Sequence, residues 1–432
     1  MERYREYKES GVKWLGEIPS HWEVVPIKYI SEVSSGATPK TSVQGYWDGN
    51  ITWVTPADFK TDTKFVLKSN RNITTLGLKS CSTVILPKGS LVFSKRAPIG
   101  QVSILKKTLC TNQGCFGIIP KESMNNSFLY YSLAIHAKSF NTLGSGTTFR
   151  ELSFSAFSSY KISVPPKAEQ DSIVRYLDSA TSEIDKAIAM QQKMIDLLNE
   201  RKQIIIQNAV TKGLDENVEM KESGVEWIGR IPKHWEVVRL SHLTSKIGSG
   251  STPKAGYVES GIIFLRSQNV YCEGLKLNDV VHISANVHRN MSGTKVLPND
   301  VLMNITGGSI GRCFYVDETL GEANVNQHVS IIRPTSIDTH YLKYYLQSYC
   351  GQIQVSLEQT GGNREGLTAK ALAKFLITYP SQSEQKEIAA YLDGEMEKFD
   401  SAITNCQRQI TLLQERKQII INEVVTGKVR VI

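Results

Sequence analysis

The sequence lacks the motifs that an enzyme acting on nucleic acid would need. Its 432 residues contain no Walker A sequence, no His-Glu-x-x-His sequence and no glycine-rich fingerprint placed to hold a nucleotide cofactor. The Gly-Ser-Gly pieces at 144–146 and 248–250 lack the Gly-Lys-Ser/Thr continuation of a phosphate-binding loop, and they indicate flexible loops instead. We therefore predict that the chain is not an enzyme, that it has no catalytic residues, and that it binds no cofactor itself.

Long apolar runs and a cysteine pattern are also missing. No run approaches the ~18 apolar residues of a membrane span, and the charged N-terminus MERYREYKES has no signal-peptide core. The seven cysteines include no Cys-x-x-Cys pair, so neither a metal site nor a disulfide framework is predicted. These features favour a reduced, cytoplasmic protein that contacts no membrane and holds no metal.

One segment near the start of the chain returns almost unchanged in its second half. Residues 8–25 read KESGVKWLGEIPSHWEVV and residues 221–238 read KESGVEWIGRIPKHWEVV. A second repeat relates LLNERKQIII at 197–206 to LLQERKQIII at 412–421. Because the repeat unit is about half the chain, it is far too long for a solenoid. It indicates a tandem duplication of one domain plus one helix.

The regions between the repeated segments are rich in short strand-like runs bounded by Gly, Pro and Asn. Strands are predicted within 50–56, 89–95, 99–105 and 115–120 in the first half, and within 262–270, 300–307, 310–316 and 328–334 in the second. A short helix should follow in each half, at 128–133 and at 341–346. Each half is therefore expected to hold a β-rich domain.

Positive charge is concentrated in these same regions. The chain carries a net charge of +8, and residues 28–164 alone hold 16 Lys and Arg against 6 Asp and Glu. Residues 239–379 hold 13 against 10. The two regions have diverged strongly, although Asn112-Gln113 still matches Asn326-Gln327. Basic middles between near-identical flanks suggest two nucleic-acid-binding domains that perform different versions of one task.

Each half closes with a long helix that follows a proline, VPPKAEQ at 164–170 and YPSQSEQ at 379–385. Each helix should run for about 40 residues, or about 60 Å, and its apolar residues follow the alternating spacing of a two-stranded coiled coil, skipped at Gln191 and Arg201. The expected partner of one helix is the other, and the alternative is that each packs on its own domain. The predicted seam comprises Ile173, Leu177, Ala180, Ile184, Ala187, Met194, Leu198 and Ile205 in the first helix and Ile388, Leu392, Phe399, Ala402, Leu413 and Ile420 in the second.

Side chains suited to base edges and phosphates lie at the ends of predicted strands and in glycine-rich loops. Arg pairs bidentately with guanine, and Asn and Gln with adenine. For any single residue a solvated surface side chain is the simpler interpretation, whereas the set in matching places favours DNA contact. The candidates are Lys40, Lys95, Arg96, Thr148, Arg150, Lys254, Arg266, Gln268, Asn269, Asn304, Arg312, Asn363 and Arg364.

These motifs together resemble those of the specificity subunits of type I restriction-modification systems, the HsdS family. The resemblance covers nearly the whole chain. It is carried by the two KESGV segments, by P-x-x-x-EQ-x-x-I-x-x-YLD at 165–178 and 380–393, and by the paired ERKQIII helices. It implies an α+β fold with pseudo-two-fold duplication, in which an antiparallel coiled coil of two long helices separates two target-recognition domains. Each of these domains should resemble the DNA-reading domain of Taq-type adenine methyltransferases.

The resemblance also implies the domain limits and the partners. Residues 1–164 and 215–379 would be the recognition domains, and 165–214 and 380–432 the central and distal helices. The partners would be double-stranded DNA, two modification (methyltransferase) subunits and two restriction subunits. S-adenosylmethionine, ATP and Mg would be bound by those subunits.

Two different readers in one duplicated chain predict a bipartite, asymmetric DNA target with an unread gap. One alternative is a fused methyltransferase or nuclease, against which the missing motifs argue. Another is a coiled-coil scaffold, either a stand-alone DNA-binding protein or one with no role on DNA. Salt-dependent DNA binding would separate the scaffold without a DNA role from a DNA reader.

Overall fold

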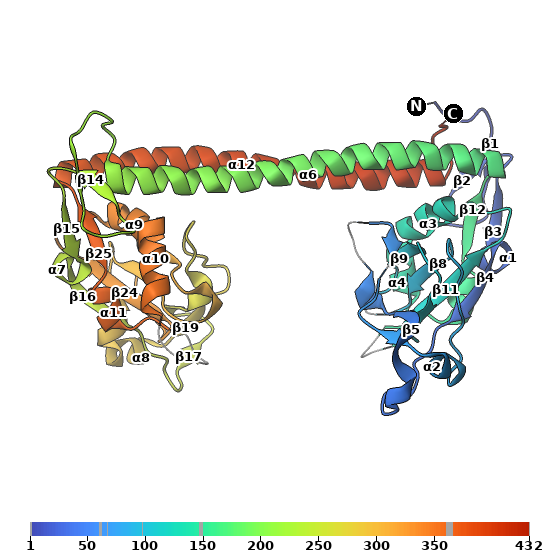
Figure 1. The fold of residues 1–432 in the computed structure, drawn as a ribbon, viewed down its shortest axis with the longest axis horizontal. Coiled ribbons are helices and arrows are strands. Elements are labelled where there is room, and N and C mark those ends of the chain that lie inside the picture. The colour runs from blue at the N-terminus through green and yellow to red at the C-terminus, as the bar shows by residue number, and fades with distance from the viewer. Residues whose placement is uncertain are drawn as a thin grey trace. The chain divides into compact units, whose positions relative to one another are not determined.

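Two long helices link two compact units, each of which contains a β-rich domain. The computed structural model describes residues 2–59, 63–66, 68–96, 98–146, 150–359 and 366–431. Unit 1 comprises Met1–Gln191 with Arg408–Ile432, and unit 2 comprises Gln192–Gln407. The long helices α6 (Lys167–Lys212) and α12 (Gln382–Val425) each place one end in each unit (Figure 1). The predicted α+β fold with a repeated domain and a pair of long helices is confirmed.

Unit 1 is built on a five-stranded sheet in the order β4-β11-β8-β9-β6, in which only the β9–β6 pair is parallel. These strands are Ser31–Ser35, Cys115–Pro120, Leu91–Ser94, Val102–Leu105 and Phe65–Val66. A three-stranded sheet contains β10 (Cys110–Thr111), β5 (Trp47–Val54) and β7 (Asn72–Ile73). The paired short strands are β1 (Tyr7–Glu9) with β2 (Glu17–Pro19) and β3 (Glu23–Pro26) with β12 (Lys161–Val164). The shorter helices are α1 (Ile27–Ile30), α2 (Thr75–Lys79), α3 (Asn126–Ile135), α4 (Ala137–Leu143) and α5 (Phe154–Ser158), with 3-10 turns η1 (Gln44–Tyr46) and η2 (Pro56–Asp58).

Unit 2 repeats this plan with a four-stranded sheet, β16-β24-β21-β22, whose strands are Thr244–Ser249, Val329–Pro334, Val301–Asn304 and Cys313–Tyr315. A second sheet runs β17-β19-β18-β23-β20, with strands Tyr257–Val258, Val281–Ile283, Ile262–Leu265, Ala323–Val325 and Lys295–Val296. The short pairs are β13 (Met220–Glu222) with β14 (Arg230–Pro232) and β15 (Glu236–Arg239) with β25 (Leu376–Tyr379). Its helices are α7 (Leu240–Leu243), α8 (Ala285–Asn290), α9 (Thr339–Gln347), α10 (Tyr349–Glu358) and α11 (Ala369–Ala373), with 3-10 turns η3 (Ser267–Asn269), η4 (Ser292–Thr294) and η5 (Gly307–Ser309).

The central strands are apolar on both faces because each face covers a different core. In β8, Leu91 and Phe93 belong to the core beneath the helices, and Val92 belongs to a smaller core on the other side. In β21, Val301 and Met303 face one core and Leu302 the other. Successive residues of a strand point to opposite faces, so a continuous apolar run marks a strand buried between two layers.

The repeated segments fasten each domain to a long helix. Trp22 is fully buried in unit 1, and the imidazole Nε2 of His21 lies 2.9 Å from Glu169 Oε2 in the first turn of α6. In unit 2 the same relation joins His234 Nε2 to Glu384 Oε1 at 2.7 Å, at the start of α12. The His residues of the repeated segment therefore hold the glutamate of the EQ motif.

The glutamine of that motif ties each helix start to a turn of the domain. The Gln170 carboxamide accepts a hydrogen bond from Asn125 N at 2.7 Å and donates to Pro165 O at 2.9 Å. Gln385 does the same with Asp338 N at 2.7 Å and Pro380 O at 2.9 Å. Both glutamines are fully buried. These bonds therefore replace the hydrogen bonds to water that the carboxamides lose on burial.

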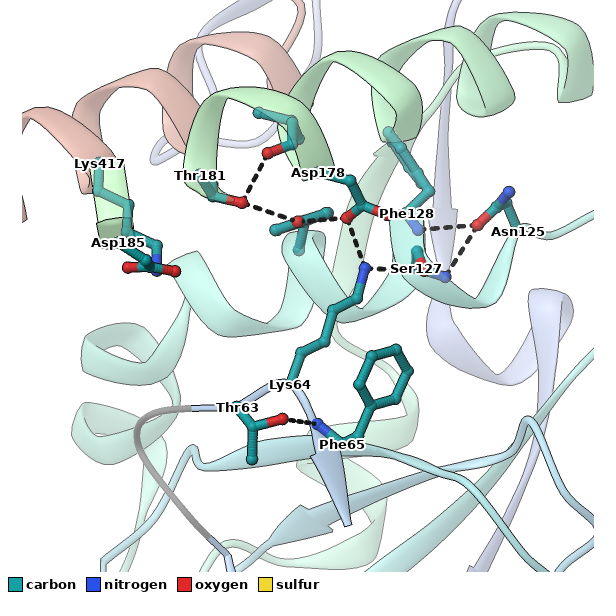
Figure 2. A network of polar contacts seen from close by, with 12 residues as sticks. Thr63, Lys64, Phe65, Asn125, Ser127, Phe128, Asp178, Thr181, Asp185 and Lys417 are labelled. Atoms are coloured by element: carbon teal, nitrogen blue, oxygen red, sulfur yellow. Dashed lines mark hydrogen bonds and ion pairs between the residues drawn. The ribbon is translucent and has the colours of Figure 1, made fainter. Parts of the chain in front are cut away.

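The aspartate of each YLD sequence makes a further contact with the domain of its own unit. Figure 2 shows the contact of Asp178 with Lys64 in unit 1. Tyr131 on α3 donates to Asp178 Oδ1 at 2.6 Å, and Lys64 Nζ lies 2.5 Å from the same oxygen. In unit 2, Tyr344 on α9 donates to Asp393 Oδ1 at 2.6 Å. The lysine there is Lys343, on α9 itself. The tyrosine is thus constant, whereas the cation comes from a different element in each unit.

Within each unit the two long helices run antiparallel. In unit 1, Lys417 Nζ lies 2.6 Å from Asp185 Oδ1, and Ile421 shares a core with Ile173 at the start of α6. In unit 2, Lys202 Nζ lies 2.6 Å from Asp400 Oδ1, and Ile206 shares a core with Met396. The early part of α6 therefore lies beside the late part of α12 in unit 1, and the late part of α6 lies beside the early part of α12 in unit 2.

The buried face of α6 drifts away from the predicted seam. Met194 is 49% exposed while its neighbour Ile195 is 7% exposed, and Ile206 is more deeply buried than Ile205. A straight α-helix turns by about 20° per heptad relative to a 3.5-residue repeat, which moves the buried position on by one residue. Of the other candidates, Ile173, Leu177, Ile184, Ile388 and Leu392 are buried, and Ala180, Ala187, Leu198, Phe399, Ala402, Leu413 and Ile420 are partly buried.

Substitutions at Ile195 and Met194 test which face of α6 is buried. Replacing Ile195 by Asp places a carboxylate in the helix pair, so we expect a loss of at least about 2–5 kcal/mol in unfolding free energy. Met194→Asp should cost about 1 kcal/mol or less, because that side chain faces solvent. Urea denaturation followed by circular dichroism measures both. Equal losses would contradict the assignment of the buried face.

The Asp393 network should make unit 2 sensitive to acid. Partial burial raises the pKa of Asp393, but hydrogen bonds from His340 and Tyr344 and the charge of Lys343 outweigh it, so the pKa falls from 3.8 to about 2. The ionised form therefore stabilises the fold above about pH 3.8, and this contribution is lost as the pH falls through about 2.

The expected signature is a pH-dependent difference between the wild type and Asp393→Asn. The stability gap should be widest above pH 4 and should shrink toward pH 2, as measured by thermal unfolding across this range. Glu397→Gln, an exposed carboxyl on the same helix, serves as the control and should show little change. A gap for Asp393→Asn that is constant with pH would contradict the network's role.

Candidate nucleic-acid interface

A loop and a turn are built in the same way in both units. The loop, which we call the TPK loop, reads GATPK at 36–40 after β4 and GSTPK at 250–254 after β16. It lies on a turn, the NQ turn, formed by residues 112–114 and 326–328. The repeat of GATPK as GSTPK is a signal in the sequence, and of these two elements the sequence prediction included only Lys40, Lys254 and the matching Asn-Gln pairs.

The loop and the turn meet through backbone contact that leaves no room for a side chain. A Cβ atom on Gly36 would collide with the carbonyl oxygen of Asn112, and one on Gly250 with the carbonyl oxygen of Val325. Gly36 N donates to Cys115 O at 3.2 Å, and Gly250 N donates to Val329 O at 3.0 Å. Glycine is therefore required at both positions by close approach.

The NQ turn is braced at the ends of parallel strand pairs. Asn112 N donates to Val54 O at 2.9 Å in unit 1, and Asn326 N to Leu265 O at 3.0 Å in unit 2. The side-chain oxygen of each Asn then accepts a backbone N–H two residues on, at 2.9 and 3.1 Å. Both asparagines thus shape the turn by a local side-chain to backbone bond.

The element displays three polar side chains in each unit. The Thr38 hydroxyl donates to the Gln113 carboxamide, and the Thr252 hydroxyl donates to that of Gln327. Lys40 and Lys254 end the two loops, are exposed, and form no ion pair within the part of the chain that the structure describes. The same hydroxyl, amide and ammonium groups therefore face solvent together in both domains.

The residues beside this constant element differ between the units. Lys95 N donates to Gly114 O at 2.9 Å, and Ile305 N donates to His328 O at 2.9 Å, so equivalent strand ends border the two turns. In unit 1 these strand ends bring two cations to Glu151, with Lys95 Nζ at 2.7 Å from its carboxylate and Arg96 at 3.9 Å.

In unit 2 the corresponding contact joins a hydroxyl and an imidazole. The Thr306 hydroxyl lies 2.6 Å from His328 Nδ1, and Gln327 Nε2 lies 3.0 Å from His328 Nε2. Thr306 and His328 were not among the sequence candidates, because neither is a Lys or Arg and neither matches its counterpart in the first half.

The other candidates that the structure describes lie in different surroundings. Arg150 is exposed, and Arg312 Cζ lies 5.1 Å from the ring of Tyr271. Arg266 and Gln268 both bond Asp279, at its carbonyl (3.0 Å) and its carboxylate (2.8 Å) respectively. Thr148, Asn363 and Arg364 lie outside the described residues.

Two candidates are buried, and the NH2 group of each side chain is already hydrogen-bonded. Asn269 donates to Lys276 O at 2.9 Å, and Asn304 donates to Ser267 O at 2.8 Å. The predicted strand over 262–270 ends at Leu265, and the 3-10 turn η3 that follows turns Asn269 inward. These two side chains support the loop after β18 and do not face solvent.

Two further classes of feature are absent from the described ranges. No cluster of three or more His, Cys, Asp or Glu side chains is placed there to ligate a metal ion. Among the helices that are described, none combines the length and the apolar character needed to cross a membrane.

Comparison with known proteins agrees with this division into two similar domains. The family model of the type I restriction modification DNA specificity domain matches residues 19–193 and again 232–414. The MjaIX specificity subunit of a type I restriction enzyme from Methanocaldococcus jannaschii is 28% identical, over 99% of this chain and 97% of its own. The EcoBI specificity subunit from Escherichia coli is 23% identical, over 92% and 86%.

Solved structures share the fold. A chain from a study of complex assembly and conformational transition of the type I R-M system superposes with a TM-score of 0.74, at 16% identity, over 95% of this chain and 99% of its own. The HsdS subunit from Thermoanaerobacter tengcongensis gives a TM-score of 0.53, at 16% identity, over 98% and 100%. Since the family model covers well over half of the sequence, the chain belongs to the type I restriction-modification DNA specificity family, the non-catalytic specificity subunits of these systems.

Proposed function

We propose that this chain selects the DNA target of a type I restriction-modification complex and reads it in two parts. Residues 1–164 would recognise one half-site and residues 215–379 the other, while the long helices (165–214 and 380–432) set the unread gap between them. The observation that carries the proposal is the constant TPK loop and NQ turn in both units, bordered by side chains that differ. A shared loop and turn would contact DNA in the same way in both domains, while the differing side chains beside them would select two different half-sites.

An asymmetric target follows from the chemistry of these borders. Lys95, Arg96 and Glu151 in unit 1 offer charged groups, whereas Thr306 and His328 in unit 2 offer a hydroxyl and an imidazole. Base edges in the major groove are distinguished by their pattern of donors and acceptors. Two sets of groups this different are expected to select different bases.

We further propose that two modification subunits dock on an apolar face that the two long helices repeat. Leu197 and Ile204 of α6, in unit 2, and Leu412 and Ile419 of α12, in unit 1, are between 49% and 54% exposed. They occupy matching places in the repeated segments LLNERKQIII (197–206) and LLQERKQIII (412–421), and their side chains are not buried in the helix pair. Repeated exposed apolar side chains are typical of a surface that a partner covers.

The chemistry would then belong to the partners. S-adenosylmethionine on the modification subunits, and ATP and Mg on two restriction subunits, would supply methyl transfer and DNA cleavage, with the assembly in the cytoplasm where its DNA lies. The missing nucleotide-binding and catalytic motifs in this chain agree with that division. The scaffold alternative is less favoured, because the positive charge is concentrated in the diverged regions.

Exchange of one diverged region tests whether the two readers are independent. Replacing residues 28–164 by the corresponding region of another family member should change one half of the methylated motif, and replacing 239–379 should change only the other. Methylation-aware sequencing of DNA from cells that express each chimera with modification subunits gives the motifs. An exchange that altered both halves would overturn the proposal.

The docking face makes a separate prediction. Leu197→Glu and Leu412→Glu should weaken binding of modification subunits while leaving the chain folded, because these side chains are exposed in the free chain. Loss of one buried leucine contact is worth ~1.5–3 kcal/mol, or roughly 10- to 150-fold in affinity, measurable by titration calorimetry. Asn199→Glu and Gln414→Glu add the same charge on another face of each helix. If these controls weakened binding equally, docking on this face would be excluded.

A further inference from the structure

We propose that the TPK loop and the NQ turn form a phosphate clamp that grips the DNA backbone in the same way at both half-sites. Thr38, Gln113 and Lys40 would contact the backbone in unit 1, and Thr252, Gln327 and Lys254 in unit 2. The clamp fixes the position of each domain on the duplex and reads no bases. This inference rests on the proposed function and names what one element contributes to it.

The ligand follows from what the two half-sites have in common. Within the DNA itself, the sugar-phosphate backbone is the surface that stays the same for two domains that read different bases. An exposed element that stays the same while its neighbours change is therefore matched to that backbone. Lys, Thr and Gln side chains are common donors to phosphate oxygens, and such contacts set position and register without carrying sequence information.

The clamp is rigid, and a rigid site suits a ligand of constant geometry such as the DNA backbone. Backbone bonds at Gly36 and Gly250, and at Asn112 and Asn326, hold the loop and the turn rigidly together in both units. A preorganised loop loses little conformational entropy when it binds.

The rigid framework also leaves its displayed groups available. Each Thr–Gln bond is made between side chains at the surface, where DNA oxygens can replace one partner. The lysine at the end of each loop has no carboxylate partner among the described residues, so its charge is free to neutralise a phosphate.

Folding alone explains part of this repeat, and the lysines separate the two explanations. Close packing accounts for Gly36 and Gly250, and bracing of the turn accounts for the asparagines. Neither accounts for an exposed lysine at the same place in both loops, because a surface side chain without a partner contributes little to stability.

The test uses Lys40→Gln, Lys254→Gln and the double variant in the full chain, assembled with modification subunits. Binding is measured by fluorescence anisotropy across a series of salt concentrations, with one duplex that carries the mapped target and one of unrelated sequence. The slope of log K against log salt is negative, and each substitution should reduce its magnitude by about 0.9, the value for one neutralised phosphate. Affinity for both duplexes should fall by a similar factor, and the methylated motif should stay unchanged.

Lys8→Gln and Lys221→Gln are the matched controls, since these lysines are also repeated and exposed, on β1 and β13. They should leave the slope unchanged. An unaltered slope for Lys40→Gln and Lys254→Gln, or an altered base preference, would overturn the clamp. Failure of the unmodified assembly to prefer the target duplex would instead contradict the proposed function, and with it the clamp.

Discussion

The attachment of each β-rich domain to a long helix is the constraint on which the rest of the molecule depends. In both units a buried tryptophan, a histidine on a glutamate and a buried glutamine join the repeated segment to the first turn of α6 or α12. A tyrosine bonded to the YLD aspartate adds a contact two turns further along. These contacts hold each domain against the first turns of the long helix on which it packs.

If each domain reads one half-site, a fixed orientation on the helix would let the rest of the domain diverge while its position on that helix stays the same. The bonds of the repeated histidine and of the EQ glutamine recur in both units, as do the TPK loop and the NQ turn. Arg96, Glu151, Thr306 and His328, which lie beside that turn, differ. The source of the cation at the YLD aspartate also differs, Lys64 from the diverged region in unit 1 and Lys343 from α9 in unit 2. The residues that differ between the units are therefore those on which the recurring bonds at the helix starts do not depend.

The duplication, the central strands of each domain and the long helices could be predicted from the sequence, because each leaves a repeated or periodic signal. The buried face of α6 could not be placed to the residue, since a 3.5-residue pattern drifts on a helix of 46 residues. Asn269 and Asn304 have the chemistry of base-reading residues, and only the fold shows that both point inward. The TPK loop, in contrast, was visible as a repeat, and its importance emerged only where the backbone of Gly36 and Gly250 meets the turn.

The most direct test of the account is the methylated motif that this chain specifies. Methylation-aware sequencing of DNA from cells that express the chain with its modification subunits should find one bipartite motif, with two different half-sites separated by a gap of fixed length and unspecified sequence. A continuous motif, or two identical half-sites, would contradict the claim that each domain reads its own half of the target.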